Sequence, residues 1–387
     1  KWIVGAPLST DRVMHERLSK RKALAVFSSD ALSSVAYATE EILLMLALAP
    51  VVANSFPWSW PIALGIVALL AIVVASYRQL INAYPNGGGA YSVSKENLGD
   101  NVGLVAGAAL IIDYILTVTV SIAAGAAAVT SAFPELNEYR VLIANLAVSV
   151  LIVINLRGVR ESGSVFAVPT YIFVGCMYAM FAWLPFVDKS HLEHTAMPLF
   201  PGTLEGVGLL LVLRAFSSGC AALTGVEAIS NGVMAFKPPE QDNAKITMTW
   251  MAIILGSLFL GVTYFAHDFY IVPKENETVV SQLARMTGNL PFYYLVQAST
   301  AAILFLAANT AFNGFPMVTS LLADDRFLPR QLASRGDRLV YSNGIIILGL
   351  ISMMLIWAFD ADVHLLIPMY AIGVFLCLYG CIPFIEM

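Results

Sequence analysis

The 387-residue chain is poor in charge. Lysine, arginine, aspartate and glutamate make up only 12% of it, about half the share in an ordinary soluble domain, whereas 58% of its residues are hydrophobic. Its mean hydropathy is +0.77. None of its apolar segments alternates as barrel strands do. The composition predicts an all-α integral membrane protein whose partner is the lipid bilayer and not nucleic acid.

Cysteine and histidine are also scarce. The four cysteines all lie in apolar segments and are interpreted as packing residues: Cys176, Cys220, Cys377 and Cys381. The five histidines form no cluster with cysteine, so zinc and copper sites are not expected. The serines of the apolar segments have no histidine beside them, which argues against a serine-based intramembrane enzyme. We predict no enzymatic activity and no cofactor.

Apolar runs long enough to cross a bilayer occur ten times. They are 22–50, 58–82, 103–133, 140–157, 163–187, 206–236, 244–272, 290–322, 343–359 and 363–385. Sixteen basic residues fall on the side of the N-terminus and four on the other, which predicts a cytoplasmic N-terminus. We therefore expect a cytoplasmic segment at 1–21 and a transmembrane core at 22–387. The chain lacks an initial methionine and ends directly after an apolar run, so we expect it to be truncated, notably at its C-terminus.

Two of these spans carry polar residues at their centres. FSSDALSSVAYATEE at 27–41 contains four serines and Asp30, and FSSGCAALTGVEAISN at 216–231 contains Thr224, Gly225 and Glu227. Serines loosen a helix, and a carboxylate at membrane depth faces a bundle interior or a cavity. Interruption of spans 1 and 6 is typical of an inverted repeat whose broken helices form the binding site. The sequence predicts a 5+5 transporter core with repeats at 22–187 and 206–387.

The side chains around these interruptions favour a cation over an amino acid. No GxG motif occurs between residues 23 and 50, so the bare N–H groups that would hold a substrate carboxylate are missing. A carboxylate at Asp30 would instead repel an amino acid's carboxylate, by roughly 4 kcal/mol at about 4 Å and an effective dielectric near 20. Hydroxyl and carboxylate oxygens are hard ligands that suit alkali cations. The candidates are Asp30, Tyr37, Tyr114, Thr117, Ser121, Thr224, Glu227 and Tyr370.

Other polar residues have structural interpretations. Asp113 is expected to pair with Arg214, the one base inside a span. Glu40 and Glu41 are expected near the outer vestibule, where they would concentrate cations. Proton coupling needs a carboxylate whose environment changes with access, for which Glu227 is the first candidate and Asp30 the second.

Several segments resemble a known family. AYPNGGGAYSVSKENLG at 83–99 and LADDRFLPRQL at 322–332 are similar to the amino acid–polyamine–organocation superfamily. Within it, the chain resembles the Kim-type bacterial potassium–proton symporters of the Kup-related branch. The stretches that carry this resemblance are FSSDALSSVAY at 27–37, DYILTVTVSIAAG at 113–125, INLRGVRES at 154–162, RAFSSGCAALTGVEAISN at 214–231, ETVVSQLA at 277–284, AANTAFNGFP at 307–316, RGDRLVYSNGI at 335–345 and HLLIPMYAIGVF at 364–375.

The resemblance implies potassium import coupled to protons across a bacterial plasma membrane. By resemblance, the potassium pathway is lined by Asp30, Tyr37, Thr117, Ser121, Thr224, Glu227 and Tyr370. Members of the group continue through two more spans into a cytoplasmic domain that binds a cyclic dinucleotide and are dimeric. CLYGCIPFIEM at 377–387 departs from that pattern, so such regulation is expected only if the full-length protein has the domain. A proton-coupled amino acid or polyamine permease and a passive channel are the alternatives.

Overall fold

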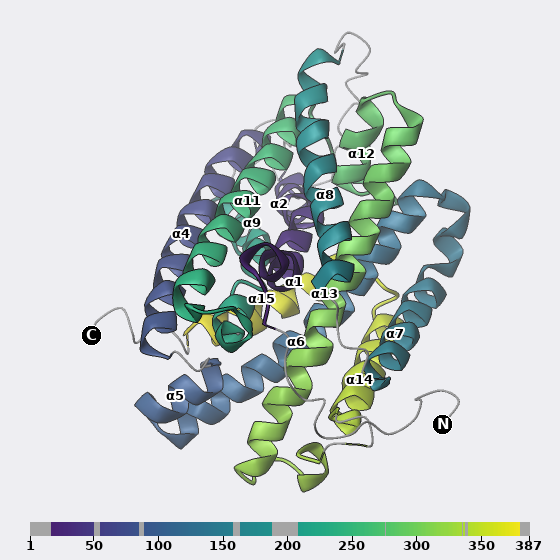
Figure 1. Cartoon of the computed structure of the whole chain (residues 1–387). Helices are drawn as coiled ribbons and strands as arrows, with labels where there is room; N and C mark the ends of the chain where they lie inside the picture. The colour runs from purple at the N-terminus through teal and green to yellow at the C-terminus, as the bar shows by residue number, and fades with distance from the viewer. Residues whose placement is uncertain are drawn as a thin grey trace.

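The computed structural model describes residues 17–49, 55–84, 89–157, 163–187, 208–274, 276–334, 336 and 340–379. These ranges are helical, without a β-strand, as the composition predicts (Figure 1). Seven helical segments in them are long and apolar enough to cross a bilayer. Two shorter apolar helices, α14 (Ser342–Ala358) and α15 (Val363–Tyr379), match predicted spans 9 and 10. The interrupted first span completes the set.

The unbroken long helices are α4 (Ser59–Ala83), α6 (Asp100–Ala132), α7 (Arg140–Leu156), α8 (Gly163–Trp183), α11 (Glu240–Asp268) and α13 (Leu290–Asp324). Short helices join them: η3 (Phe56–Trp58), α5 (Ala90–Leu98), η4 (Pro134–Tyr139), η5 (Leu184–Phe186), η7 (Val233–Ala235), α12 (Val279–Met286) and η8 (Arg330–Leu332).

Span 1 is broken at its centre, as the serines predict. It consists of α1 (Lys20–Ser33), a 3₁₀ turn η2 (Ser34–Ala36) and α2 (Ala38–Ala47). The Ser33 hydroxyl donates to the carbonyl of Asp30 at 2.7 Å, and the Ser34 hydroxyl donates to that of Ala31 at 2.6 Å. These bonds give carbonyls near the end of α1 a side-chain partner, so the chain can leave the α-helical pattern there without exposing bare backbone groups.

Span 6 is interrupted at the corresponding place. α9 (Leu209–Gly219) passes into a 3₁₀ turn η6 (Cys220–Leu223), and the short helix α10 (Ala228–Asn231) follows. Between them Gly225 has φ +73°, a left-handed conformation that glycine adopts without strain. The predicted break at Gly225 is therefore confirmed.

Corresponding spans of the two halves pack against each other. α4 lies along α11, α6 along α13, and α7 along α14, while α2 packs on α9. Figure 1 shows α1 in the middle of the bundle, where it contacts α8, α11 and α13. The two interruptions also touch, since η2 contacts η6. This arrangement brings the polar centres of spans 1 and 6 together inside an apolar bundle.

Candidate ion-binding site

Carboxylates from spans 1, 3 and 6 meet at the two interruptions. Asp30 of α1 is 7% exposed and Asp113 of α6 is 4% exposed. Glu227, the residue before α10, lies close enough to interact electrostatically with both. One oxygen of Asp30 and one of Asp113 have no hydrogen-bond partner among the described residues. Buried carboxylate oxygens without donors point to a ligand that brings positive charge.

Gly225 sets how closely the two interruptions approach. A Cβ atom at this position would lie 2.7 Å from Cγ of Asp30 and 2.8 Å from the backbone nitrogen of Ala31. Span 6 backbone therefore packs directly on the Asp30 carboxyl group, and only glycine leaves room for it. The Ser34 hydroxyl lies 3.3 Å from the carbonyl oxygen of Ala222, which adds a second link between the breaks.

Hydroxyl groups surround the carboxylates. Thr117 and Tyr370 share a hydrogen bond of 2.9 Å between their hydroxyl oxygens, and both residues are buried. The Tyr37 hydroxyl is within hydrogen-bonding reach of the Thr224 side chain. The charges of Asp30 and Asp113 act on both tyrosines. Two helices and the breaks of spans 1 and 6 thus supply neutral oxygens around a shared group of carboxylates.

The structure brings six of the eight predicted residues to this group: Asp30, Tyr37, Thr117, Thr224, Glu227 and Tyr370. Ser121 is buried about one turn further along α6. The Tyr114 ring instead packs on Gly314 of α13, where an added Cβ atom would lie 2.5 Å from that ring. The hydroxyl stripe of span 3 is therefore spread along the helix, with Thr117 at its centre.

The expected pair between Asp113 and Arg214 is wrong. Arg214 lies on the exposed side of α9 and makes no ion pair with a described residue, whereas Asp113 faces Asp30 and Glu227. A helical pattern shows that a base lies within a span but not which way its side chain turns, and Arg214 turns away from the bundle. Asp113 consequently belongs to the carboxylate group that sequence reasoning assigned to Asp30 and Glu227 alone.

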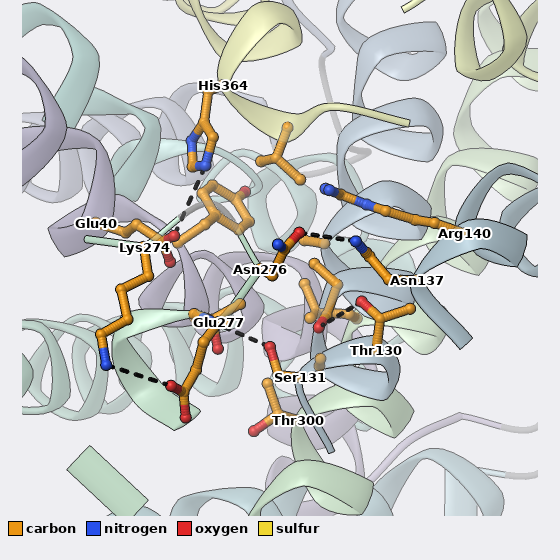
Figure 2. A pocket seen from close by; sticks show the side chains of 18 residues that line it. Glu40, Thr130, Ser131, Asn137, Arg140, Lys274, Asn276, Glu277, Thr300 and His364 are labelled. Carbon is orange, nitrogen blue, oxygen red and sulfur yellow. Dashed lines mark hydrogen bonds and ion pairs between the residues drawn. The ribbon is translucent and has the colours of Figure 1, made fainter. Parts of the chain in front are cut away.

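A small cavity lies on the outer side of Tyr37. Its lining includes Tyr37, Glu40, Arg140, Lys274 and His364. Figure 2 labels the last four of these around the cavity. Its volume is about 30 Å³, room for roughly two water molecules. Tyr37 lines this cavity and also interacts with Asp30, so one side chain separates the cavity from the carboxylate group.

Glu40 and Glu41 are both buried, and Glu40 lines this outer cavity, near which the sequence placed it. They are 4% and 0% exposed. Nδ1 of His364 lies 2.6 Å from Oε1 of Glu41, and its Nε2 lies 3.7 Å from Oε1 of Glu40. His364, at the start of α15, thereby ties span 10 to the outer half of span 1. The sequence shows no sign of this contact, because His364 is there only a single histidine at the start of the segment HLLIPMY.

On the opposite side, α5 is fixed to the end of α13. Asp325 accepts hydrogen bonds from Lys95 at 2.6 Å and from the Tyr91 hydroxyl at 2.5 Å. These two donors lower the pKa of Asp325, because they stabilise its charged form. The segment after span 2 is thus held against span 8.

Comparison with known proteins agrees with this geometry. A family described as amino acid permease matches residues 18–382. The chain belongs to the amino acid permease family. The potassium transporter KimA of Bacillus subtilis (strain 168) is 50% identical over 379 residues, which are 97% of this chain and 62% of that protein. The low-affinity putrescine importer PlaP of Escherichia coli (strain K12) is 24% identical over 221 residues, which are 52% of this chain and 45% of that protein.

A solved structure supports the fold. The substrate-bound outward-open state of a Na⁺-coupled sialic acid symporter matches with a TM-score of 0.51 and 14% identity, over 95% of this chain and 79% of that one. The family match and this solved structure confirm the all-helical transporter-type fold that the sequence predicts. The chain spans about three fifths of the length of KimA.

Proposed function

We propose that this chain is the membrane core of a secondary transporter that imports potassium together with protons by alternating access. The observation that carries the proposal is the meeting of Asp30, Asp113 and Glu227 at two touching helix breaks, where one buried oxygen each of Asp30 and Asp113 has no donor among the described residues. A dehydrated alkali cation supplies positive charge and accepts hydroxyl, carboxylate and carbonyl ligands. The potassium transporter at 50% identity supports the same cargo.

The ligands proposed for potassium are Asp30, Tyr37, Thr117, Thr224 and Tyr370 around the centre. Tyr114 and Ser121, which lie to either side of Thr117 on α6, are proposed to line the route to it. We add Asp113, because its free carboxylate oxygen is buried in the same group. The bond between Thr117 and Tyr370 orients two neutral ligands toward that group.

Proton coupling is proposed to lie at Glu227, with Asp30 as the second candidate. Glu227 directly follows the irregular segment at Gly225 and precedes a helix of four residues, so its surroundings can change when span 6 tilts. A bound cation favours the ionised carboxylate, and its departure favours the protonated one. A group that alternates in this way couples the two fluxes.

A polyamine permease is the second candidate, because the putrescine importer is a relative and a diamine would also tolerate three carboxylates. An amino acid is disfavoured, since Asp30 stands where its carboxylate would have to bind. Proteoliposomes loaded with protein separate these functions. We expect uptake of labelled rubidium, competition by potassium, and accompanying proton influx. Uptake of putrescine or amino acids without rubidium uptake would refute the proposal.

Three further proposals concern the whole protein. The repeats are proposed to span 22–187 and 206–387, after a cytoplasmic segment at 1–21 that lies largely outside the described residues. A homodimer is proposed for the full-length protein. Regulation by a cyclic dinucleotide is proposed only for a protein that carries the additional cytoplasmic domain.

A further inference from the structure

An apolar groove runs along the surface where α4 and α11 lie side by side, at the left of Figure 1. Its volume is about 750 Å³. Its lining includes Val67, Ala71 and Arg78 of α4, and Lys245, Thr249 and Gly256 of α11. Both helices are long enough to cross the bilayer, so the groove faces lipid.

The lining residues differ in depth: Leu70, Val74 and Gly256 are buried, whereas Ala71 and Ala75 of α4 are exposed. A Cβ atom added at Gly256 of α11 would lie 3.6 Å from Val67, in ordinary contact. Ile253 of α11 also lines the groove and is 53% exposed. Such a channel between two packed helices offers contact area to a narrow apolar chain.

One end of the groove is basic. Arg78 donates to the Thr249 hydroxyl at 2.9 Å, and a guanidinium group has five N–H donors. No described carboxylate forms an ion pair with Arg78. Lys245 contacts Asn82 at 2.8 Å and pairs with Asp242 at 3.0 Å, whose side chain is 63% exposed. Within the described part of the chain, Arg78 therefore carries a positive charge that no carboxylate pairs with.

The length of the groove matches one leaflet. From Val67 to Arg78 the helix rises roughly 16 Å at about 1.5 Å per residue, and half of the hydrocarbon core is about 15 Å thick. The distribution of basic residues puts the Arg78 end on the cytoplasmic side. We propose that this groove binds an anionic phospholipid of the cytoplasmic leaflet, its phosphate on Arg78 and Lys245 and an acyl chain along the groove between α4 and α11.

A second copy of the chain fits this groove less well. In a twofold dimer about an axis along the membrane normal, identical patches face each other at the same depth, so Arg78 of each copy would oppose its equivalent. An anionic headgroup instead neutralises this charge. Basic pockets between helices on the cytoplasmic side are a recurring form of such lipid sites.

The test uses the full-length protein in nanodiscs of equimolar phosphatidylglycerol and phosphatidylethanolamine, followed by mild extraction and native mass spectrometry. We expect retained phosphatidylglycerol in the wild type. Arg78→Gln should reduce its retention about fivefold, the effect of one basic group near the membrane surface. Arg330→Gln, an exposed base on the same side outside the groove, is the matched control and should retain the lipid.

A second variant tests the apolar part. Ala71→Leu adds bulk inside the groove and should release the bound phosphatidylglycerol, whereas Ala298→Leu on the exposed side of α13 should not. Equal losses in Arg78→Gln and Arg330→Gln would reduce the effect to general surface charge and overturn the proposal. Dissociation of a dimer by Ala71→Leu without loss of lipid would likewise overturn it, and would identify the groove as an interface between copies.

Discussion

Replacement of Asp30 by asparagine isolates the charge of the candidate site. The change keeps the shape of the side chain, and one of its oxygens makes no hydrogen bond that the amide would lose. At about 4 Å and an effective dielectric near 20, a carboxylate attracts a monovalent cation by roughly 4 kcal/mol. At about 1.4 kcal/mol per factor of ten, this is close to a thousandfold in affinity. Asp113 and Glu227 remain in the variant. Because its affinity for the cation is nevertheless about a thousandfold lower, we expect uptake to fall to background at cation concentrations that saturate the wild type.

The assay is uptake of labelled rubidium into proteoliposomes over a range of concentrations. Asp100→Asn, the same chemical change at an exposed position at the start of α6, serves as the control and should behave like the wild type. Size-exclusion profile and thermal stability of both variants should match the wild type, which separates lost binding from lost folding. Wild-type uptake by the Asp30 variant would refute the assignment of this carboxylate to the site.

Other changes test the remaining roles. Glu227→Gln should abolish proton influx driven by a potassium gradient and retain slow cation exchange, because glutamine mimics the protonated acid; unchanged proton influx in simultaneous flux recordings would move coupling elsewhere. Thr117→Val should weaken apparent rubidium affinity about fivefold, with little effect on maximal rate, because it removes one neutral oxygen and its bond to Tyr370. Ser121→Ala should have a similar or smaller effect. Wild-type affinity in both variants would show that these α6 hydroxyl groups only pack against neighbouring helices. Gly225→Ala should lower the melting temperature and stop uptake, since the left-handed conformation alone costs about 1–2 kcal/mol and the new methyl group meets Asp30. The control is Gly208→Ala, where a new methyl group would meet no other atom. Normal uptake by the Gly225 variant would show that the two breaks need not touch.

The sequence predicted the parts of this protein that depend on local composition. Long apolar runs can only be membrane spans, and Ser33 and Ser34 offer local hydrogen bonds that compete with a continuous helix wherever they occur. A carboxylate at the centre of a span needs a polar interior in any fold. For these reasons the spans, both interruptions and the place of Asp30 and Glu227 at those interruptions followed from short segments.

The tertiary structure decided which of these polar groups meet. Asp113 and Arg214 are both single charges within spans, and only the rotation of their helices turns one into the bundle and the other out of it. Glu41 and His364 are 323 positions apart, and their contact depends on how span 10 packs on span 1. The fit of Gly225 on Asp30 likewise depends on packing between the repeats. Periodicity fixes the depth of a side chain in the membrane, whereas its neighbours across the bundle follow from helix rotation and packing, which no local pattern specifies.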